Sequence, residues 1–400
     1  MAQLRDTDAG ARAVPATAGA SHTAAGGSGD AATAATDSRR FGLDFIRAVA
    51  VSMVLVAHGS ILAMPLWTPG DTMILLAYWG VELFFVLSGF LIGGLLIEGH
   101  VRGPGWVPQF WVRRWLRTLP NYYLFLALNV LFVAVYQGGD APWPAYALFV
   151  QNLAWPHPLF FGEAWSLAVE EVFYLLAPLL AVAIAPFARS RRAALALFVA
   201  ALAGFLLLRI GATLLGDPAW DAGVRKITLL RLDAIGFGVL AIYLVKRCPA
   251  IDRYRGMLAL AGVLLAVLAA GAFLGLARDT SVFARSALFT LTSLAFALLL
   301  PWAARWEGRW LGRTGRRLVV WLAVTSYALY LTHMLVIRLL LEHGHQARDA
   351  LAFAIGFGAY AAVSLLCAGV VYRWFEKPTL QSRDAVSRAL FGKATGSGKA

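Results

Sequence analysis

Residues 43–64 read LDFIRAVAVSMVLVAHGSILAM, a run that is apolar apart from two serines and three ionisable side chains. About 20 such residues, coiled into a helix, cross the roughly 30 Å hydrocarbon core of a bilayer. The run therefore predicts a membrane-spanning helix that carries Asp44 and Arg47 near its start and His58 near its end.

Apolar runs of similar length follow along the chain, which is 60% hydrophobic and only 14% charged. A soluble domain has about 25% charged residues. The sequence therefore predicts an all-α, polytopic membrane protein, a bundle of about ten transmembrane helices within a membrane domain at 41–378. The expected spans are 43–64, 74–97, 119–136, 165–187, 193–215, 227–245, 256–277, 286–304, 318–341 and 351–372. A shorter apolar piece, 145–155, is too brief to cross and is expected to be re-entrant or interfacial.

Basic residues divide unevenly between the two sides of such a bundle. With the N-terminus inside, the inner loops hold sixteen Lys and Arg residues and the outer loops five. Positive loops stay in the cytoplasm, so we expect both termini there, with 1–40 a disordered tail and 379–400 a basic tail. The same asymmetry accounts for the net charge of +13 without nucleic acid as a partner. The expected location is the plasma (inner) membrane, as a multi-pass protein.

Arg47 and His58 are eleven residues apart, which places them on nearly the same helix face and about 16 Å apart along the axis. Arg114 and Arg117, spaced i, i+3, share a face of the next basic segment. Guanidinium groups clustered at the cytoplasmic end of the bundle are suited to bind phosphate groups. The alternatives are positive-inside anchoring for Arg113 to Arg117 and a purely structural, buried role for His58.

Further ionisable residues form a layer near the outer side. One of Glu170 and Glu171 must face the bundle interior, and either carboxylate could orient His58 by holding its second ring nitrogen. Glu82 and the neighbouring Arg231 and Asp233 are more typical of structural ion pairs. The sequence leaves the role of His333 open.

Together these layers suit a long, phosphorylated donor whose reactive end reaches across the membrane, as an acyl-CoA thioester does. The phosphates would lie on the arginines, and the acyl carbon would lie near His58. His58 would act as general base on an acceptor hydroxyl or would carry the acyl group transiently. No metal is expected, because His58 and His333 lack a third ligand at coordinating spacing.

Seven stretches of the chain resemble the acyltransferase 3 family of integral-membrane O-acyltransferases, in the family's order. They are LDFIRAVAVSMVLVAH (43–58), GVELFFVLSGFLIGGLL (80–96), RRWLRTLP (113–120), AWSLAVEEVFYLLAPLL (164–180), RLDAIGFGVL (231–240), SYALYLTHMLVI (326–337) and YRWFEKPTL (372–380). At Glu82 the family more often has Asp, which keeps the charge.

The resemblance implies an acyl-CoA donor from the cytoplasm, acetyl-CoA above all, and a hydroxyl acceptor on a carbohydrate or lipid-linked glycan. It also implies His58 as the central catalytic residue and Arg47, Arg114 and Arg117 as donor-binding residues. Some family members carry a fused extracytoplasmic domain. This chain is expected to act alone or with a separate extracytoplasmic transferase or glycan-assembly protein.

Two other functions remain open on the residues themselves. A transporter or exporter of a polar or lipid-linked molecule also uses intramembrane Arg, Glu and His. A structural or sensory membrane protein would use the charged layer only to hold its helices together. The sequence does not identify the acceptor, the acyl group, the oligomeric state or an acyl-histidine intermediate.

Overall fold

A computed structural model describes residues 40–392 except 65, 68–69, 102–104 and 188–189. The tail expected at 1–40 lies, apart from Arg40, outside the described residues. Within the described part there are helices and no strands, and nine helices are long and apolar enough to span a membrane. A shorter apolar helix lies alongside them and completes the expected ten. The prediction of an all-α, multi-pass membrane protein is confirmed.

The bundle helices lie at the expected spans, except that the helix expected at 119–136 already begins at Trp106. They are α2 (Phe41–Gly59), α3 (Asp71–Val101), α4 (Trp106–Phe132), α6 (Ala164–Ile184), α7 (Arg191–Gly216), α8 (Leu232–Arg247), α10 (Arg255–Gly275), α12 (Ala287–Ala303), α13 (Arg313–Glu342) and α14 (Ala350–Val371). The short helices are α5 (Trp143–Ala147), α9 (Pro249–Arg253) and α11 (Val282–Arg285), and α15 (Lys377–Phe391) follows α14 through a π-helical turn at Tyr372–Glu376. Part of the expected basic tail is therefore helical.

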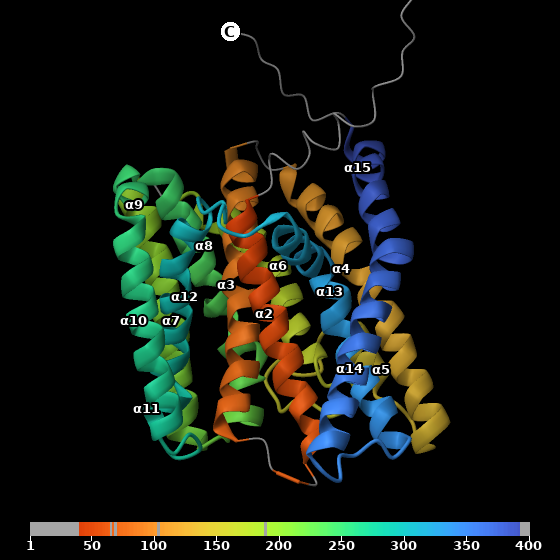
Figure 1. Ribbon diagram of the computed structural model, residues 1–400. Coiled ribbons are helices and arrows are strands. Elements are labelled where there is room, and N and C mark those ends of the chain that lie inside the picture. Colours follow the sequence, from red (N-terminus) through yellow and green to blue (C-terminus); the bar gives the residue numbers. More distant parts are fainter. Residues whose placement is uncertain (1–39, 65, 68–69, 102–104, 188–189, 393–400) are drawn as a thin grey trace, which may run out of the picture. The chain divides into compact units, whose positions relative to one another are not determined.

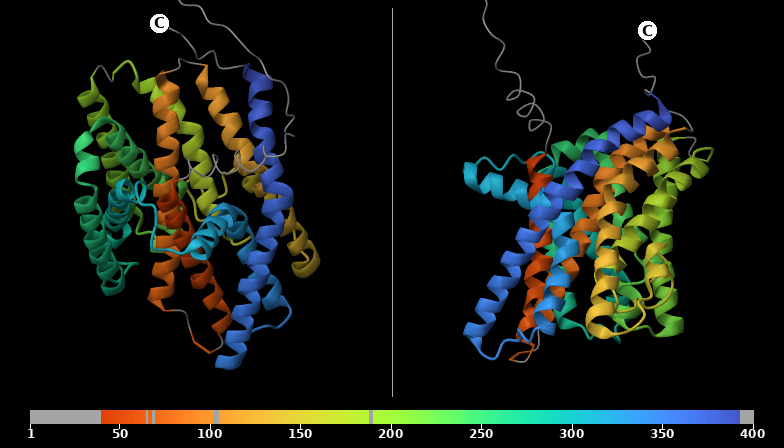
Figure 2. Two further views of the ribbon diagram at one scale, coloured as in Figure 1. Left: turned by 45° about the horizontal axis from the view of Figure 1, so that its top comes forward. Right: turned by 90° about the vertical axis from the view of Figure 1, so that its right-hand side faces the viewer.

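α2 and α3 lie in the middle of the bundle, with α7, α10 and α12 on one side and α4, α14 and α15 on the other (Figures 1 and 2). The described chain begins at α2 and ends after α15 at the same end of the bundle, which is the top of Figure 1. We call this the upper end. The opposite, lower end holds the connection from α2 to α3 and helix α11.

Glycines bring α3 and α8 unusually close together. A Cβ atom on Gly89 would lie 1.8 Å from the carbonyl oxygen of Ile235, and one on Gly238 would lie 1.9 Å from that of Val86. No side chain fits at either position without moving a backbone. Small residues allow such close helix contacts in membranes, where packing rather than the hydrophobic effect drives association.

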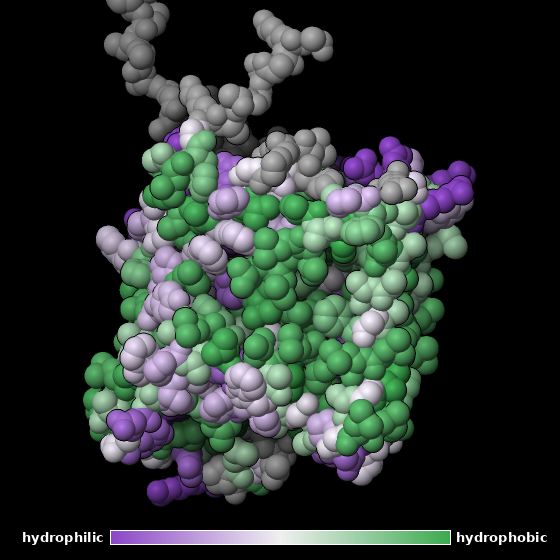
Figure 3. Space-filling model, turned by 180° about the vertical axis from the view of Figure 1, so that it is seen from behind, coloured by the Kyte–Doolittle hydropathy of each residue, from purple (hydrophilic) through white to green (hydrophobic). Residues whose placement is uncertain are grey.

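The outer surface of the bundle is apolar at mid-height. Seen from behind, hydrophobic residues cover the middle of the molecule, and hydrophilic residues gather mainly toward its upper and lower edges (Figure 3). Exposed leucines such as Leu207, Leu215, Leu260 and Leu268 belong to α7 and α10. A belt of this kind suits contact with lipid chains rather than water.

The segment expected to be too short to cross forms α5 and a series of turns at the lower end. Asn152 fixes it there, because its Nδ2 donates to the carbonyl oxygens of Lys226, at 2.6 Å, and Trp165, at 3.1 Å. Gln151 Nε2 donates to the carbonyl of Ala164. These bonds attach the turns to the start of α6 and to the segment before α8.

Candidate active site

A cavity of about 540 Å³ lies among α3, α4, α6 and α13, with Arg47 of α2 and Arg383 of α15 also in its wall. Along α3 it extends from Gly99, near the upper end, to Val81, a rise of about 27 Å at 1.5 Å per residue. Apolar side chains of α3 form one long wall. The cavity is therefore long, and it reaches the upper end, where Arg113 and Arg383 are partly exposed.

Arginines line this cavity from its mouth inward: Arg383, Arg113, Arg114, Arg117 and Arg47. The structure thus brings the three arginines predicted to form one site, Arg47, Arg114 and Arg117, to a single cavity. Arg114 lies over the Tyr174 ring, 4.1 Å from its centroid, and Arg47 pairs with Asp44 at 3.3 Å. Arg117 interacts electrostatically with Arg114, Arg47 and Glu376. Several cations around one narrow space make it suitable for a polyanionic ligand.

Glu170 and Glu171 point in different directions, as adjacent helical residues must. Glu170 lines the cavity and accepts a hydrogen bond from Tyr174 Oη at 2.7 Å. Glu171 faces α4 and accepts one from Thr118 Oγ1 at 2.6 Å. The hydrogen bonds of the described residues join neither carboxylate to His58. The expectation that one of them orients His58 is therefore wrong for this structure, because α6 turns both toward α4 and the arginines.

His58 instead pairs with His333 of α13. His58 Nδ1 lies 3.1 Å from His333 Nε2, and His333 Nδ1 lies 3.3 Å from the carbonyl oxygen of Leu329. His333 is 1% exposed. The sequence contained His333 at the right depth, but nothing in it indicated that α2 and α13 pack together.

The hydrogen bonds of this pair assign its protons. The Leu329 carbonyl can only accept, so His333 carries its proton on Nδ1, and its Nε2 is then an acceptor in the neutral ring. His58 must donate from Nδ1. The Nε2 atom of His58 therefore keeps a free lone pair, as a general base or nucleophile requires.

Tyr330 adjoins both the cavity and the histidine pair. It lines the cavity, and its ring centroid is 5.6 Å from that of His333. Its hydroxyl is 2.6 Å from Ser166 Oγ and also donates to the carbonyl of Glu163 at 3.3 Å. His58 and His333 are not among the residues that line the cavity, and Tyr330 is a lining residue beside His333.

Charged and buried polar groups gather below the histidines, at the lower end. Arg225 lies 4.8 Å from the Trp165 ring centroid and pairs with Asp221, which also pairs with Lys226. Although burial opposes ionisation of Asp221, Arg225 and Lys226 outweigh it and hold the pKa of its carboxyl at about 2. Burial raises the pKa of Glu163 to about 8, and burial together with Lys226 lowers the pKa of His157 to about 3.

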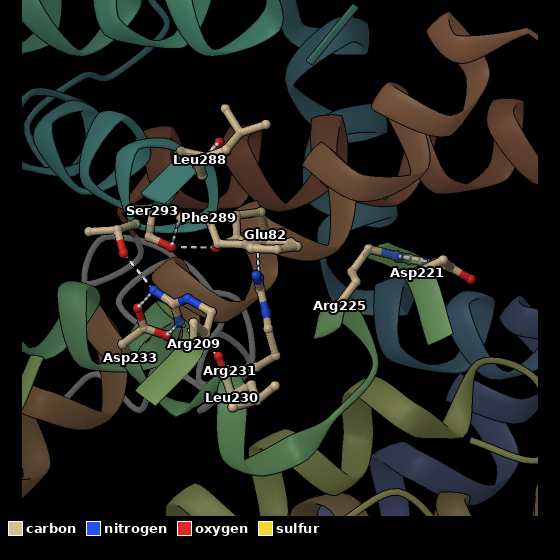
Figure 4. A network of polar contacts seen from close by, with 12 residues as sticks. Glu82, Arg209, Asp221, Arg225, Leu230, Arg231, Asp233, Leu288, Phe289 and Ser293 are labelled. Carbon is tan, nitrogen blue, oxygen red and sulfur yellow. Dashed lines mark hydrogen bonds and ion pairs between the residues drawn. The ribbon is translucent and has the colours of Figure 1, made fainter. Parts of the chain in front are cut away.

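A second set of charges, drawn in Figure 4, does not line the cavity. Arg209 of α7 binds Asp233 of α8 through two bonds of 2.7 Å, and Arg231 pairs with Glu82 of α3, which also accepts from Ser293. Arg231 and Asp233 thus pair with other helices and not with each other. Arg209, which the sequence analysis missed, is fully buried. These groups join α3, α7, α8 and α12 and have a structural role.

Comparison with known proteins agrees with the family resemblance found in the sequence. A family described as "Acyltransferase domain" matches residues 40–373. YrhL of Bacillus subtilis (strain 168) is 29% identical over 232 residues, which is 52% of this chain and 34% of the relative. "Peptidoglycan O-acetyltransferase OatA" of Listeria monocytogenes serovar 1/2a is 31% identical over 157 residues, 34% of this chain and 23% of the relative. The "O-acetyltransferase OatA" of Staphylococcus aureus (strain NCTC 8325 / PS 47) is equally similar, with 24% of it covered.

The aligned regions span about a quarter to a third of the length of these relatives. No solved structure matches the chain.

Proposed function

The chain belongs to the acyltransferase 3 family, and from this premise we propose that it is a membrane O-acetyltransferase that uses acetyl-CoA. The acceptor is a hydroxyl of an envelope or secreted glycan, at the lower end of the bundle. Relatives named as peptidoglycan O-acetyltransferases support this class of acceptor. We place the protein in the inner membrane, with its upper end in the cytoplasm.

One observation above all supports this function: the arginine-lined cavity extends to Tyr330, whose ring lies beside His333, the hydrogen-bond partner of His58. The donor's phosphates would bind the arginines near the upper end. Its thin, neutral arm would follow the apolar wall of α3 toward Tyr330. The thioester would then react beside the histidine pair.

In the transfer step, His58 Nε2 takes the proton of the acceptor hydroxyl while the oxygen attacks the acyl carbon. The carbon–sulfur bond breaks, an ester bond forms, and the proton passes from His58 to the departing thiolate to give CoA. His333 holds the His58 ring in the tautomer that this step needs. Arg225 and Lys226, which act electrostatically on His58, would favour the anionic tetrahedral intermediate.

The test uses membranes with matched amounts of the wild-type chain, His58→Ala, Arg47→Ala and His343→Ala. Release of free CoA from labelled acetyl-CoA and label in the glycan fraction are both measured. We expect His58→Ala to abolish transfer, Arg47→Ala to weaken donor use, and His343→Ala, an exposed histidine, to behave as wild type. Equal transfer by wild type and folded His58→Ala would reject His58 as catalytic residue, and an absence of acetyl transfer by the wild type would favour the transporter alternative.

A further inference from the structure

Helix α15 lies beyond residue 373, where the family match ends. It packs against α4 at the upper end of the bundle. Arg113 of α4 pairs with Asp384 at 3.0 Å, and Gln109 Nε2 lies 3.4 Å from Oγ of Ser387, which is buried. This helix is therefore a fixed part of the cavity's surroundings and is contributed by a segment outside the matched domain.

Arg383 brings α15 into the cavity itself. Its side chain lines the mouth together with Arg113 and is 25% exposed. Both arginines pair with the same carboxylate, that of Asp384, at 3.3 and 3.0 Å. Asp384 is shared by two guanidinium groups, and Glu98, another carboxylate of the cavity wall near the upper end, pairs with Lys246, so Arg113 and Arg383 keep donors for a ligand.

The ion pair that joins α15 to α4 does not involve Arg383. Its ion pair is with its own neighbour in the sequence, so it joins no two helices. The pair between Arg113 and Asp384 already fastens α15 to α4. A cation whose ion pair joins no two helices and that lines the upper part of a cationic cavity is suited to bind a ligand.

We propose that α15 completes the donor site and that Arg383, with Arg113, binds a phosphate group at the nucleotide end of the acyl-CoA. This inference rests on the proposed function, because it takes acyl-CoA as the occupant of the cavity. The nucleotide carries the donor's phosphates, and guanidinium groups bind phosphate through paired hydrogen bonds. The deeper arginines then face the rest of the pyrophosphate and the arm.

The test compares wild type, Arg383→Gln, Arg383→Lys and Arg388→Gln in purified, detergent-solubilised protein. Arg388 is a matched control because it lies exposed on the same helix and is not part of the cavity wall. The KM for acetyl-CoA, the kcat, and the inhibition constants of CoA and of pantetheine are measured. Pantetheine keeps the thiol and the thin arm of CoA but has no phosphate.

We expect Arg383→Gln to raise the KM for acetyl-CoA and the inhibition constant of CoA about tenfold, the loss typical of one charge-assisted hydrogen bond. The kcat and the inhibition constant of pantetheine should stay unchanged. Arg383→Lys should recover most of the affinity, and Arg388→Gln should match wild type.

An unchanged KM in Arg383→Gln would overturn the inference. So would an equal loss of affinity for CoA and pantetheine, or a fall in kcat that Arg383→Lys does not rescue, since these indicate a structural role. If the wild type uses no acetyl-CoA at all, the proposed function fails first, and this result is distinct from a failure of the Arg383 assignment.

Discussion

At the residue scale, the decisive feature is the pair formed by His58 and His333. The sequence showed a histidine on the same face as Arg47, and it showed that a polar group should hold its second nitrogen. It did not show which polar group this is, because one sequence alone does not tell which helices pack against each other. The carboxylates of α6 were the nearest candidates by depth, but a histidine of α13 takes that place.

Two replacements of His333 test whether this residue positions the His58 ring or only fills space between the helices. In His333→Ala the His58 ring loses the acceptor that fixes its tautomer, so kcat should fall on the order of 10- to 100-fold, with the KM for acetyl-CoA unchanged. In His333→Gln the amide oxygen can accept from Nδ1, and activity should stay within about tenfold of wild type. Steady-state kinetics and a pH profile check this, and equal losses in both variants would contradict it.

The raised pKa of Glu163 predicts that the stability of the protein depends on pH. Burial raises the pKa of its carboxyl from its ordinary value near 4.5 to about 8, so the folded protein keeps a proton that the unfolded chain loses. Between these two values the folded state binds more protons, and stability falls as pH rises. Relative to Glu163→Gln, wild type should lose several degrees of Tm in detergent from pH 5 to pH 8.5. A constant Tm difference between the two proteins across this range would refute the assignment.

At the element scale, the sequence predicted where the helices lie but misplaced the start of α4. The expected span at 119–136 begins in the structure at Trp106, because three arginines lower the hydropathy of that stretch without interrupting its helix. Their position inside α4, rather than in a loop before it, is what puts Arg114 and Arg117 in the cavity wall. Hydropathy detects lipid contact, whereas the arginines of this segment line the cavity instead.

The contact between α3 and α8 depends on glycine at specific positions. Gly89→Ala would push a methyl group into the Ile235 carbonyl and should destabilise the protein by about 1–3 kcal/mol, with lower Tm and yield in detergent. Gly94→Ala is the matched control on the same helix, because only the end of the Lys246 side chain, 3.8 Å away, approaches that position. Equal stability of the two variants would mean that the helices are not packed this closely.

At the scale of the whole molecule, buried ion pairs join several helices to one another. Arg231 and Asp233 looked like a pair in sequence, but Arg231 lies in the turn before α8 and Asp233 in the first turn of α8, and each pairs with another helix. Arg209 lies inside the expected span 193–215, but nothing in the sequence indicated that its partner is Asp233, 24 residues away. Long-range pairing of this kind needs the fold and cannot be read from local patterns.

Loss of one partner in this set should cost more than loss of both. Arg209→Met leaves Asp233 buried without its cation and should destabilise the protein by about 3–5 kcal/mol. The double variant Arg209→Met with Asp233→Leu should recover part of that loss. Thermal unfolding in detergent measures both, and additive losses would show that the two groups do not interact.

The distribution of basic residues predicts the orientation of the molecule. Since the described chain starts and ends at the same end of the bundle, one experiment tests both sides. A fluorescent protein fused after residue 400 should fold and emit, whereas alkaline phosphatase fused there should be inactive and should be active when inserted at 217–218, between α7 and α8. The reverse pattern would invert the molecule and place the arginine-lined mouth outside the cell.

The hydroxyl contact between Tyr330 and Ser166 has a consequence for the cell as well as for the reaction. A cavity that runs about 27 Å along a helix of a membrane protein shortens the barrier between two compartments held at different voltage and pH. Tyr330 and Ser166 both line the cavity, so their contact is part of the barrier that remains. An enzyme that passes an acyl group across a membrane must do so without letting protons leak down their gradient. A tyrosine ring that moves aside only when the donor binds would allow the transfer and prevent the leak.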